Sequence, residues 1–384
     1  MINVAIIGTG AISSTHIKGY LQFLGRCKIV AFCDIYPEKA EKVAKNFNLD
    51  VDIYSDYKQM LNRSDINLVS ICTPPYTHAE VAISSLNAGK HVLVEKPMAS
   101  SLEECDAMNG AQEKSGKHLS VISQNRFTNP MMKLKAILNT NLMGPIVHAQ
   151  VDSFWWRGHN YYDLWWRGTY EKEGGGCTLN HAVHHIDIFH WMNGMPSDIT
   201  AITSNTSHDN AEVEDLSIAI CRYPNGSLAQ ITSSVVHHGE EQQLIFQGKN
   251  ARVSVPWKIN ASKSKENGFP IKDEELEAKI QKAYELLPNL EFQSHTAQID
   301  DVLSAIEGKK EVLVDGKEGR KTLELITAIY QSASTDQTVK LPLDKTSPFY
   351  TREGILKNVT YFYEKKTSIE NFTENVITTG RKYE

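Results

Sequence analysis

A glycine-rich turn near the start of the chain most constrains what it can fold into. The apolar run from Val4 to Ile7 suits a buried strand, the turn follows it directly, and a helix is expected from about Ile12. Glycine is needed first for the tight turn and second so that the backbone can approach a pyrophosphate. The helix N-terminus then offers amide hydrogens and a partial positive charge to the phosphates. The sequence therefore predicts dinucleotide binding by Gly8, Thr9, Gly10, Ala11 and Ile12.

Strand-like and helix-like segments alternate through the first third of the chain. Short apolar runs at 29–33, 68–72 and 91–94 are separated by helical patterns such as 102–115. Strands that alternate with helices of this length favour right-handed βαβ units and a parallel, doubly wound sheet. We therefore predict an α/β Rossmann domain over residues 1–123.

The pattern changes after Val121. A helix at 179–193 is followed by strand-like segments at 197–204, 213–222, 227–236, 242–248 and 251–255. A run of strands after an alternating half predicts a second, α+β domain with a large, mostly antiparallel sheet. We assign it to residues 124–384, leaving the tail from 343 without a predicted structure. The polar segment 258–275 is predicted to be a surface excursion.

Composition excludes several classes of function. The 384 residues carry a net charge of −6 with acids and bases interspersed, which indicates no nucleic-acid surface. No apolar run reaches ~18 residues, so no transmembrane helix is expected, and the early first strand leaves no room for a signal peptide. The six cysteines are scattered without a CxxC pair. We expect a reducing, cytoplasmic location.

An acidic residue stands where a ribose-binding group is needed. Asp34 ends the second predicted strand and follows Gly10 at close to the ~20-residue offset expected of such an acid. A carboxylate there would repel a 2′-phosphate, and no arginine follows within residues 35–37. The sequence therefore favours NAD over NADP as cofactor.

A second unusual stretch ends the strand at 91–94. Glu95 and Lys96 follow that strand, and Pro97 blocks further pairing. Opposite charges where a buried strand stops contribute little to folding, whereas the carboxyl ends of strands in an open α/β sheet are where ligands bind. We expect Lys96 to face a cofactor and a substrate, the alternative being an ordinary surface charge.

These motifs resemble those of the Gfo/Idh/MocA oxidoreductases over roughly residues 2–342. The resemblance is carried by Gly8 to Ile12, Cys72 to His78, Glu95-Lys96-Pro97, Gly174 to Gly176 through Asn180, His184 and Asp187, and residues 328–333. It implies a two-domain, pyridine-nucleotide-dependent dehydrogenase acting on sugars, sugar derivatives or cyclitols. It also implies a homodimer or homotetramer assembled through the sheet of the second domain.

The resemblance also implies roles for individual residues. Family members use the lysine of the triplet at the reacting centre, here Lys96, together with Asn180 and His184. The commonest family pattern has aspartate at position 180, and because asparagine cannot act as a base, Asn180 points to substrate binding. To the cofactor site we add Thr73, Pro74, Pro75, His78, Glu95, Lys96 and Gln124, which follows the last strand of the first domain.

Oxidising a secondary alcohol needs a base for the hydroxyl proton and a hydride acceptor near the carbinol carbon. Burial beside a positively charged nicotinamide would lower the pKa of Lys96, and His184 titrates near physiological pH. Our hypothesis is that His184 takes the proton while Lys96 hydrogen-bonds the same oxygen; the reverse assignment stays open. His181, His184 and His185 share a helix face, but no acid or cysteine completes a set of ligands, so no metal is expected.

Residues 155–170 hold four tryptophans, three tyrosines and two arginines. Aromatic faces stack on the CH faces of pyranose or cyclitol rings, although packing at a subunit interface would also use them. Arg126 could reach the substrate or form a hinge salt bridge. We predict substrate binding by Arg126, Tyr162, Trp165, Arg167, Asn180, His181 and His184.

The leading interpretation is an NAD-dependent dehydrogenase that oxidises a ring hydroxyl of a sugar, glycoside or cyclitol to a ketone. A neutral substrate is preferred because no strongly basic pocket motif is present. The alternatives are a glycosidase that uses bound NAD for transient oxidation, and a non-catalytic nucleotide-sensing regulator. Intact Lys96 and His184 argue against the regulator.

Overall fold

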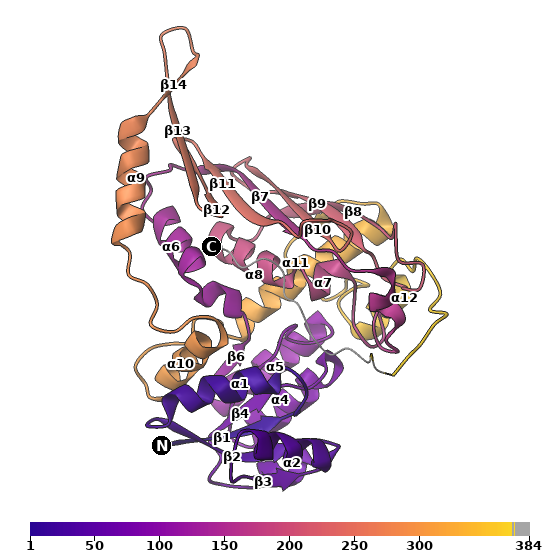
Figure 1. The fold of residues 1–384 in the computed structure, drawn as a ribbon. Helices are drawn as coiled ribbons and strands as arrows, with labels where there is room; N and C mark the ends of the chain where they lie inside the picture. Colours follow the sequence, from indigo (N-terminus) through magenta and orange to yellow (C-terminus); the bar gives the residue numbers. More distant parts are fainter. Residues whose placement is uncertain (371, 373–384) are drawn as a thin grey trace. The chain divides into compact units, whose positions relative to one another are not determined.

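The computed structural model describes residues 1–370 and 372, and it divides into two compact units (Figure 1). The first unit comprises Met1–Phe127 and Leu290–Leu323; the second comprises Thr128–Asn289 and the described residues from Glu324 onward. The predicted division after residue 123 differs from this one, because it places 290–323 in the second domain.

The first unit is built on a six-stranded, wholly parallel sheet in the order β3-β2-β1-β4-β5-β6. The strands are β1 (Ile2–Ile7), β2 (Cys27–Cys33), β3 (Asp52–Tyr54), β4 (Leu68–Ile71), β5 (His91–Val94) and β6 (Leu119–Val121). The order reverses at β1, whose neighbours are β2 and β4, so the loops after β1 and β4 border a topological switch point. The predicted Rossmann fold is confirmed.

Helices connect these strands at the places that the local sequence indicates. They are α1 (Ser13–Tyr20), α2 (Pro37–Asn46), α3 (Tyr57–Leu61), α4 (His78–Asn87) and α5 (Leu102–Ser115), with short 3-10 turns at Leu21–Phe23 and Pro75–Thr77. A 3-10 turn at Gln124–Phe127 follows the last strand, and α10 (Ser294–Ile306) joins the unit from later in the chain. Pro37 occupies the first turn of α2, and the Ser101 hydroxyl caps α5 by accepting from the Glu104 amide. Gly116, with φ +65°, ends α5 in the left-handed conformation.

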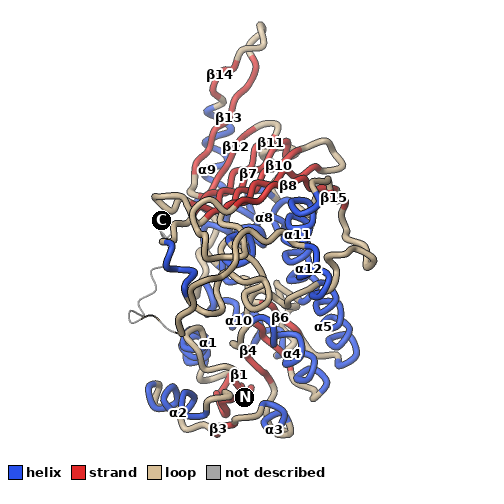
Figure 2. Tube along the Cα trace, turned by 90° about the vertical axis from the view of Figure 1, so that its right-hand side faces the viewer, coloured by secondary structure: helices blue, strands red, loops and turns tan. Residues whose placement is uncertain are grey.

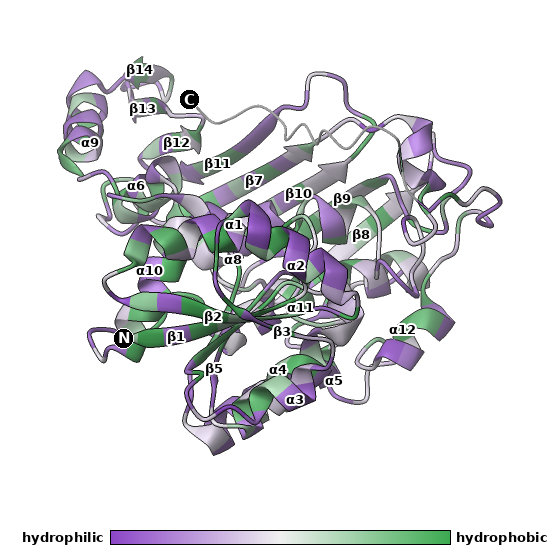
Figure 3. Cartoon of the chain, turned by 60° about the horizontal axis from the view of Figure 1, so that its bottom comes forward, coloured by the Kyte–Doolittle hydropathy of each residue, from purple (hydrophilic) through white to green (hydrophobic). Residues whose placement is uncertain are grey.

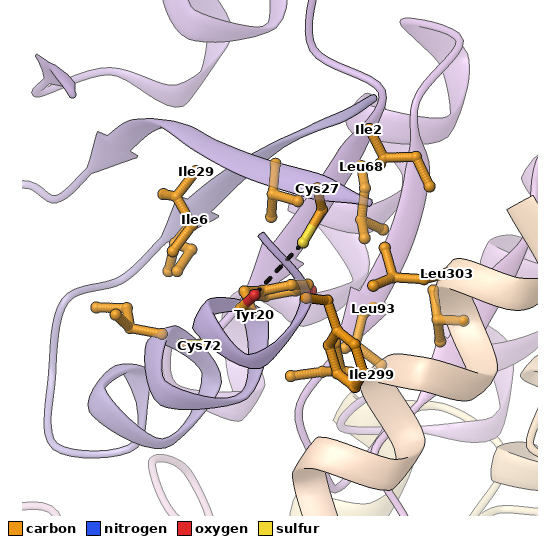
Figure 4. Close-up of a cluster of buried hydrophobic side chains, with 14 of the residues drawn as sticks. Ile2, Ile6, Tyr20, Cys27, Ile29, Leu68, Cys72, Leu93, Ile299 and Leu303 are labelled. Atoms are coloured by element: carbon orange, nitrogen blue, oxygen red, sulfur yellow. Dashed lines mark hydrogen bonds between the residues drawn. The ribbon is translucent and has the colours of Figure 1, made fainter. Parts of the chain in front are cut away.

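The core of the first unit explains why residues 290–323 belong to it. Strands β1 and β2 are mostly hydrophobic along their length (Figure 3). Ile299 and Leu303 of α10 pack into the same cluster as Tyr20 of α1 and Leu93 of β5 (Figure 4). Gly19 lets the two helices approach, since a Cβ there would lie 2.5 Å from the Ile299 side chain. Each buried aliphatic side chain of this kind contributes about 1.5–3 kcal/mol.

The second unit contains a nine-stranded sheet in the order β14-β13-β12-β11-β7-β10-β9-β8-β15 (Figure 2). Only β7 and β10 pair in parallel among its described strands, so the predicted, mostly antiparallel sheet is confirmed. The strands are β7 (Ile146–Phe154), β8 (Asp198–Ser204), β9 (Leu216–Arg222), β10 (Leu228–Ser234), β11 (Gln242–Gly248), β12 (Ala251–Val255), β13 (Lys258–Ser264), β14 (Pro270–Lys272) and β15 (Val339–Lys340).

Helices α7 and α8 pack against one face of this sheet. The helices of the unit are α6 (Asn129–Leu138), α7 (Cys177–Asn180), α8 (Val183–Asn193), α9 (Glu274–Leu286) and α12 (Arg352–Asn358), with a 3-10 turn at His159–Asp163; α11 (Gly316–Thr335) spans the division between the units. The helix predicted at 179–193 is thus two helices that meet at His181 and Ala182. In the described part of the chain, no helix is both long and apolar enough to cross a membrane.

The predicted surface excursion at 258–275 is exposed as expected, but it contains two strands that the sequence did not predict. Strands β13 and β14 form a hairpin that extends the sheet, with Val253 of β12 opposite Ile259 of β13 (Figure 1). Most of its side chains are exposed on both faces, so the sequence shows no alternation of apolar and polar residues that would mark a strand.

Candidate functional site

The glycine turn of the first unit is shaped by the loop that follows β4. Gly8 has φ +88°, and a Cβ on it would lie 2.8 Å from the carbonyl carbon and oxygen of Cys72. Its amide donates to the Cys33 carbonyl at 2.8 Å. Only glycine fits this position, where the ends of β1, β2 and β4 meet.

Gly10 has the opposite environment. No atom lies within 4 Å of where its Cβ would be, so the backbone faces open space at the start of α1. Between the glycines, the Thr9 amide and hydroxyl both donate to one oxygen of Asp34, at 2.8 and 2.7 Å, and the other Asp34 oxygen accepts from the Tyr36 amide. An open backbone beside a fixed carboxylate fits the pyrophosphate and ribose of a dinucleotide.

The loop after β4 is tied to the turn after β5 by one histidine. The fully buried His78 ring lies 2.8 Å from the carbonyl oxygens of both Thr73 and Pro97. Burial lowers its pKa, and a neutral imidazole has one N–H to donate. His78 therefore contacts the backbone of the loop after β4 and that of the turn after β5.

Glu95 is buried at the carboxyl end of β5, where two histidines face its carboxylate. Its Oε1 lies 2.9 Å from His16 Nε2 and 3.4 Å from His295 Nε2, and its Oε2 accepts from the Lys96 amide. Burial alone would raise the pKa of Glu95, but the histidine hydrogen bonds outweigh it and hold that pKa well below its usual range. A fixed carboxylate anion therefore adjoins Lys96.

Sequence reasoning missed both histidines. His16 carries a local signal, because it shares one face of α1 with the buried Tyr20, four residues on. His295 carries none, because it lies two hundred residues after Glu95 in the chain.

Gln124 and Arg126 differ in what surrounds them. The side-chain oxygen of Gln124 is buried and has no hydrogen-bond partner within the described residues, so a donor from a bound ligand would satisfy it. Arg126 is fully buried and its guanidinium donates to Glu318 at 2.9 Å. That ion pair is the arrangement expected of a structural arginine.

In the second unit, a glycine turn orients Asn180. Its side-chain nitrogen donates to the carbonyl of Gly175 at 2.6 Å and lies 3.3 Å from that of Gly176. An amide held by its nitrogen presents only its oxygen, an acceptor, to a ligand hydroxyl. This geometry suits hydroxyl binding, as sequence reasoning proposed for Asn180.

A buried carboxyl that sequence reasoning did not identify holds this turn. Glu214 accepts from the amides of Gly176 and Thr178 and from the Tyr330 hydroxyl, at 2.9–3.2 Å. Burial raises its pKa. A Cβ on Gly176 would lie 2.0 Å from the Glu214 carbonyl, so the turn and this residue pack directly together.

The aromatic segment centres on Tyr161, which the sequence analysis did not select. The Arg167 guanidinium lies over the rings of Tyr161 and Trp166, 4.2 and 4.3 Å from their centroids, and pairs with the buried Glu173 at 3.0 Å. The Tyr161 hydroxyl also lies 3.5 Å from His181 Nε2. Arg167 and His181 therefore meet at Tyr161.

The two aromatic residues that the sequence predicted for substrate binding, Tyr162 and Trp165, differ in their exposure. Tyr162 is 1% exposed and packs edge-on against Tyr161 and His208, whereas Trp165 is 46% exposed with Lys172 over its ring. The sequence could not separate Tyr161 from Tyr162, because neighbouring residues in a short 3-10 turn have no periodic pattern to indicate which one is buried.

His185 belongs to the core of the second unit. Its Nδ1 lies 2.8 Å from the Ser153 hydroxyl of β7, and burial lowers its pKa to about 4. Three groups that could hold a metal do converge among the described residues, but they are His16, Glu95 and His295 rather than the histidines of the second unit.

Acid should destabilise the protein through His185. Its folded pKa of about 4 lies below the 6.5 of an exposed histidine, so the unfolded chain binds the extra proton and stability falls as pH drops from 6.5 to 4. The loss should reach about 3 kcal/mol. Urea unfolding of the wild type and His185→Gln at pH 7 and 4.5 should show a smaller pH-dependent loss in the variant; equal losses would contradict this assignment.

These features define a class: an oxidoreductase with an NAD-binding Rossmann unit followed by a second α/β unit. Residues 2–123 match the model described as "Oxidoreductase family, NAD-binding Rossmann fold", and residues 135–341 match "Oxidoreductase family, C-terminal alpha/beta domain". The chain belongs to the Gfo/Idh/MocA oxidoreductase family.

Several characterised proteins are similar to this chain. An inositol 2-dehydrogenase of Salmonella typhimurium is 27% identical over 50% of this chain and 54% of its own length. A D-glucoside 3-dehydrogenase of Escherichia coli is 24% identical over 88% of this chain and 97% of its own. The WlbA dehydrogenase of Bordetella pertussis, solved with NADH and UDP-GlcNAcA, is 28% identical with a TM-score of 0.76, covering 89% of this chain and 98% of its own. The chain spans 54 to 60% of the length of the first curated relatives it matches.

Proposed function

We propose that this protein is an NAD-dependent dehydrogenase that oxidises a ring hydroxyl of a sugar, glycoside or cyclitol to a ketone. The observation that carries the proposal is Lys96 beside the buried Glu95 carboxylate, at the same sheet edge as the dinucleotide turn. The inositol and glucoside dehydrogenases similar to this chain support a polyhydroxylated ring as substrate.

The residues around the turn fit the cofactor. Gly8 to Gly10 leave open backbone for the pyrophosphate, the fixed Asp34 carboxylate suits ribose hydroxyls, and the buried Gln124 oxygen can accept from an amide. NAD supplies the hydride acceptor when it is bound. The Asp34 carboxylate would repel a 2′-phosphate, which favours NAD over NADP.

The proton is handled by Lys96 and His184. One takes the hydroxyl proton while the other donates a hydrogen bond to the same oxygen, and the order of the two roles stays open. Asn180 presents an acceptor to a neighbouring hydroxyl, and Arg167 with Tyr161 offers a cation and an aromatic face for the ring.

A substrate screen tests this function. NADH formation is followed at 340 nm with inositols, aldoses, alkyl glucosides, anhydrosugars and uridine-diphosphate sugars, using NAD and NADP in parallel. We expect turnover with at least one neutral ring compound and at least about tenfold preference for NAD. Glycoside cleavage without net NADH would instead indicate transient oxidation. Tight NAD binding with no reaction in either assay would indicate a sensor.

We further propose that the protein is a cytoplasmic homodimer or homotetramer. Its six cysteines are all buried and free, as expected in a reducing compartment. On the sheet of the second unit, Ile202, Ile218, Ile220 and Leu228 lie on neighbouring strands and are 46–73% exposed. An apolar patch of this kind favours association with a second copy.

Ile218→Asp should therefore disrupt the oligomer. Light scattering after size exclusion should show at least a halving of the mass relative to the wild type, because a charge would have to be desolvated in the interface. Ile271→Asp, on the β13–β14 hairpin, is the control and should leave the mass unchanged. If Ile271→Asp lowered the mass of the oligomer and Ile218→Asp did not, the interface would lie on the hairpin instead.

A further inference from the structure

Three buried polar side chains converge inside the first unit, and two of them, His16 and His295, have no assigned role. His16 comes from α1, Glu95 follows β5, and His295 comes from α10. They are fully to largely buried, and both imidazoles point a ring nitrogen at the same carboxylate oxygen, Glu95 Oε1.

The distance between His16 and Glu95 favours a hydrogen bond over shared metal coordination. Ligand atoms on a tetrahedral zinc lie about 3.3 Å apart when each bond is about 2.0 Å. The 2.9 Å between His16 Nε2 and Glu95 Oε1 is shorter than that and typical of a hydrogen bond. Because Glu95 is an anion that only accepts, each Nε2 must carry the hydrogen.

The cluster is anchored on several sides. The other ring nitrogen of His16 lies 2.8 Å from the Ser70 hydroxyl of β4, so the imidazole bridges β4 and the end of β5. On the far side of the carboxylate, Glu95 Oε2 accepts from the Lys96 amide at 3.1 Å. A continuous line of hydrogen bonds therefore runs from Ser70 through His16 and Glu95 to the backbone of Lys96.

The position of His16 links this line to the dinucleotide turn. Helix α1 begins at Ser13, directly after the glycine turn, and the Ser13 hydroxyl donates to the Gly10 carbonyl at 2.7 Å. His16 lies in the first turn of that helix. A shift of the turn on binding a dinucleotide would move the imidazole that holds Glu95.

We propose that His16 and His295 are positioning residues for Lys96, acting through the Glu95 carboxylate that both of them hold. They fix the orientation of the carboxylate, which fixes the backbone from which the Lys96 side chain projects, and His16 couples that backbone to the dinucleotide turn. Only the catalytic role of Lys96 rests on the function proposed above; the positioning itself does not.

Hydrogen exchange at the Lys96 amide tests the positioning without a substrate or a cofactor. The full-length protein is compared with His16→Leu and His295→Leu by mass spectrometry. Pro97 has no amide hydrogen, so the exchange signal of Lys96 has no contribution from the following residue. We expect exchange at Lys96 to accelerate about tenfold or more in the variants, since a charge-assisted hydrogen bond is weakened. Amides within β5 should keep their wild-type rates.

Two further variants keep the proposal falsifiable if His16→Leu fails to fold. His295→Gln keeps an N–H donor near the position of Nε2 and should restore slow exchange, whereas His295→Leu should not. His118→Leu is the matched control: His118 stacks on His91 at the opposite end of β5, with ring centroids 5.1 Å apart, and should leave Lys96 exchange unchanged. Unchanged exchange in His295→Leu, or equal acceleration in His118→Leu, overturns the proposal.

A kinetic measurement extends the test once the screen has yielded a substrate. His295→Leu should lower kcat about tenfold, with the Kd for NAD within twofold of wild type by fluorescence titration, and His295→Gln should recover most of the loss. Faster exchange at Lys96 with an unaltered kcat would show that the cluster positions the backbone without serving catalysis, and this overturns the functional half of the proposal. A screen without any substrate leaves the exchange result to decide the positioning alone.

Discussion

Lys96→Met is expected to lower kcat by about a thousandfold, because the variant loses both a proton carrier and a cation at the reacting oxygen. Methionine keeps much of the length and apolar character of the lysine stem, so the packing at the end of β5 should persist. The stability of the protein should change by less than about 1 kcal/mol in urea titrations. The measurement is kcat on the substrate that the screen identifies, beside the Kd for NAD.

Lys28→Met is the matched control, because Lys28 is an exposed lysine on β2 of the same unit. It should leave kcat and KM within twofold of wild type. His184→Gln should cause a loss comparable to that of Lys96→Met if the two groups act on one oxygen, and the double variant should then lose little more. A Lys96→Met enzyme that keeps a tenth or more of its turnover would contradict a direct role for this lysine.

Gly10→Ala is expected to raise the Kd for NAD at least a hundredfold while leaving the fold intact. The structure has no atom within 4 Å of the new methyl group, so the unliganded protein should accommodate it. The methyl would occupy the space through which a pyrophosphate approaches the backbone. Fluorescence titration with NAD and thermal unfolding without NAD measure the two effects separately.

Two other glycines provide the contrast. Gly8→Ala places a methyl 2.8 Å from the Cys72 carbonyl at φ +88°, and it should lower the stability of the unliganded protein. Gly89→Ala has a similar positive φ of 74° but open surroundings, and should cost about 1 kcal/mol without changing NAD affinity. A Gly10→Ala protein that binds NAD as tightly as the wild type would place the pyrophosphate elsewhere.

The sequence predicted well those parts in which the physical cause is local. Strands β1, β4 and β5 are short, apolar and almost wholly buried. The glycine turn, Asp34 and Lys96 follow the carboxyl ends of strands in the same sheet, so each could be recognised without its neighbours. The strands of the second sheet could also be predicted, because buried and exposed residues alternate along strands such as β9.

The remainder depended on contacts distant in the chain. His295 and Glu214 each hold a site from another segment, and nothing in their own surroundings marks them. The β13–β14 hairpin was missed because most of its side chains are exposed, so its strands lack a clear alternation of apolar and polar residues. The ion pair of Arg126 with Glu318 joins residues nearly two hundred positions apart, which a reading of local pattern cannot foresee.

The return of residues 290–323 to the first unit has a consequence for biosynthesis. The polypeptide passes between the units after Phe127, Asn289 and Leu323, so neither unit is a continuous segment. While the ribosome has released only the Rossmann strands, the surface that Ile299 and Leu303 later cover is exposed to water. The nascent nucleotide-binding unit therefore has to wait for more than a hundred and fifty further residues before its core closes, and chaperones that bind apolar surface have that interval in which to act.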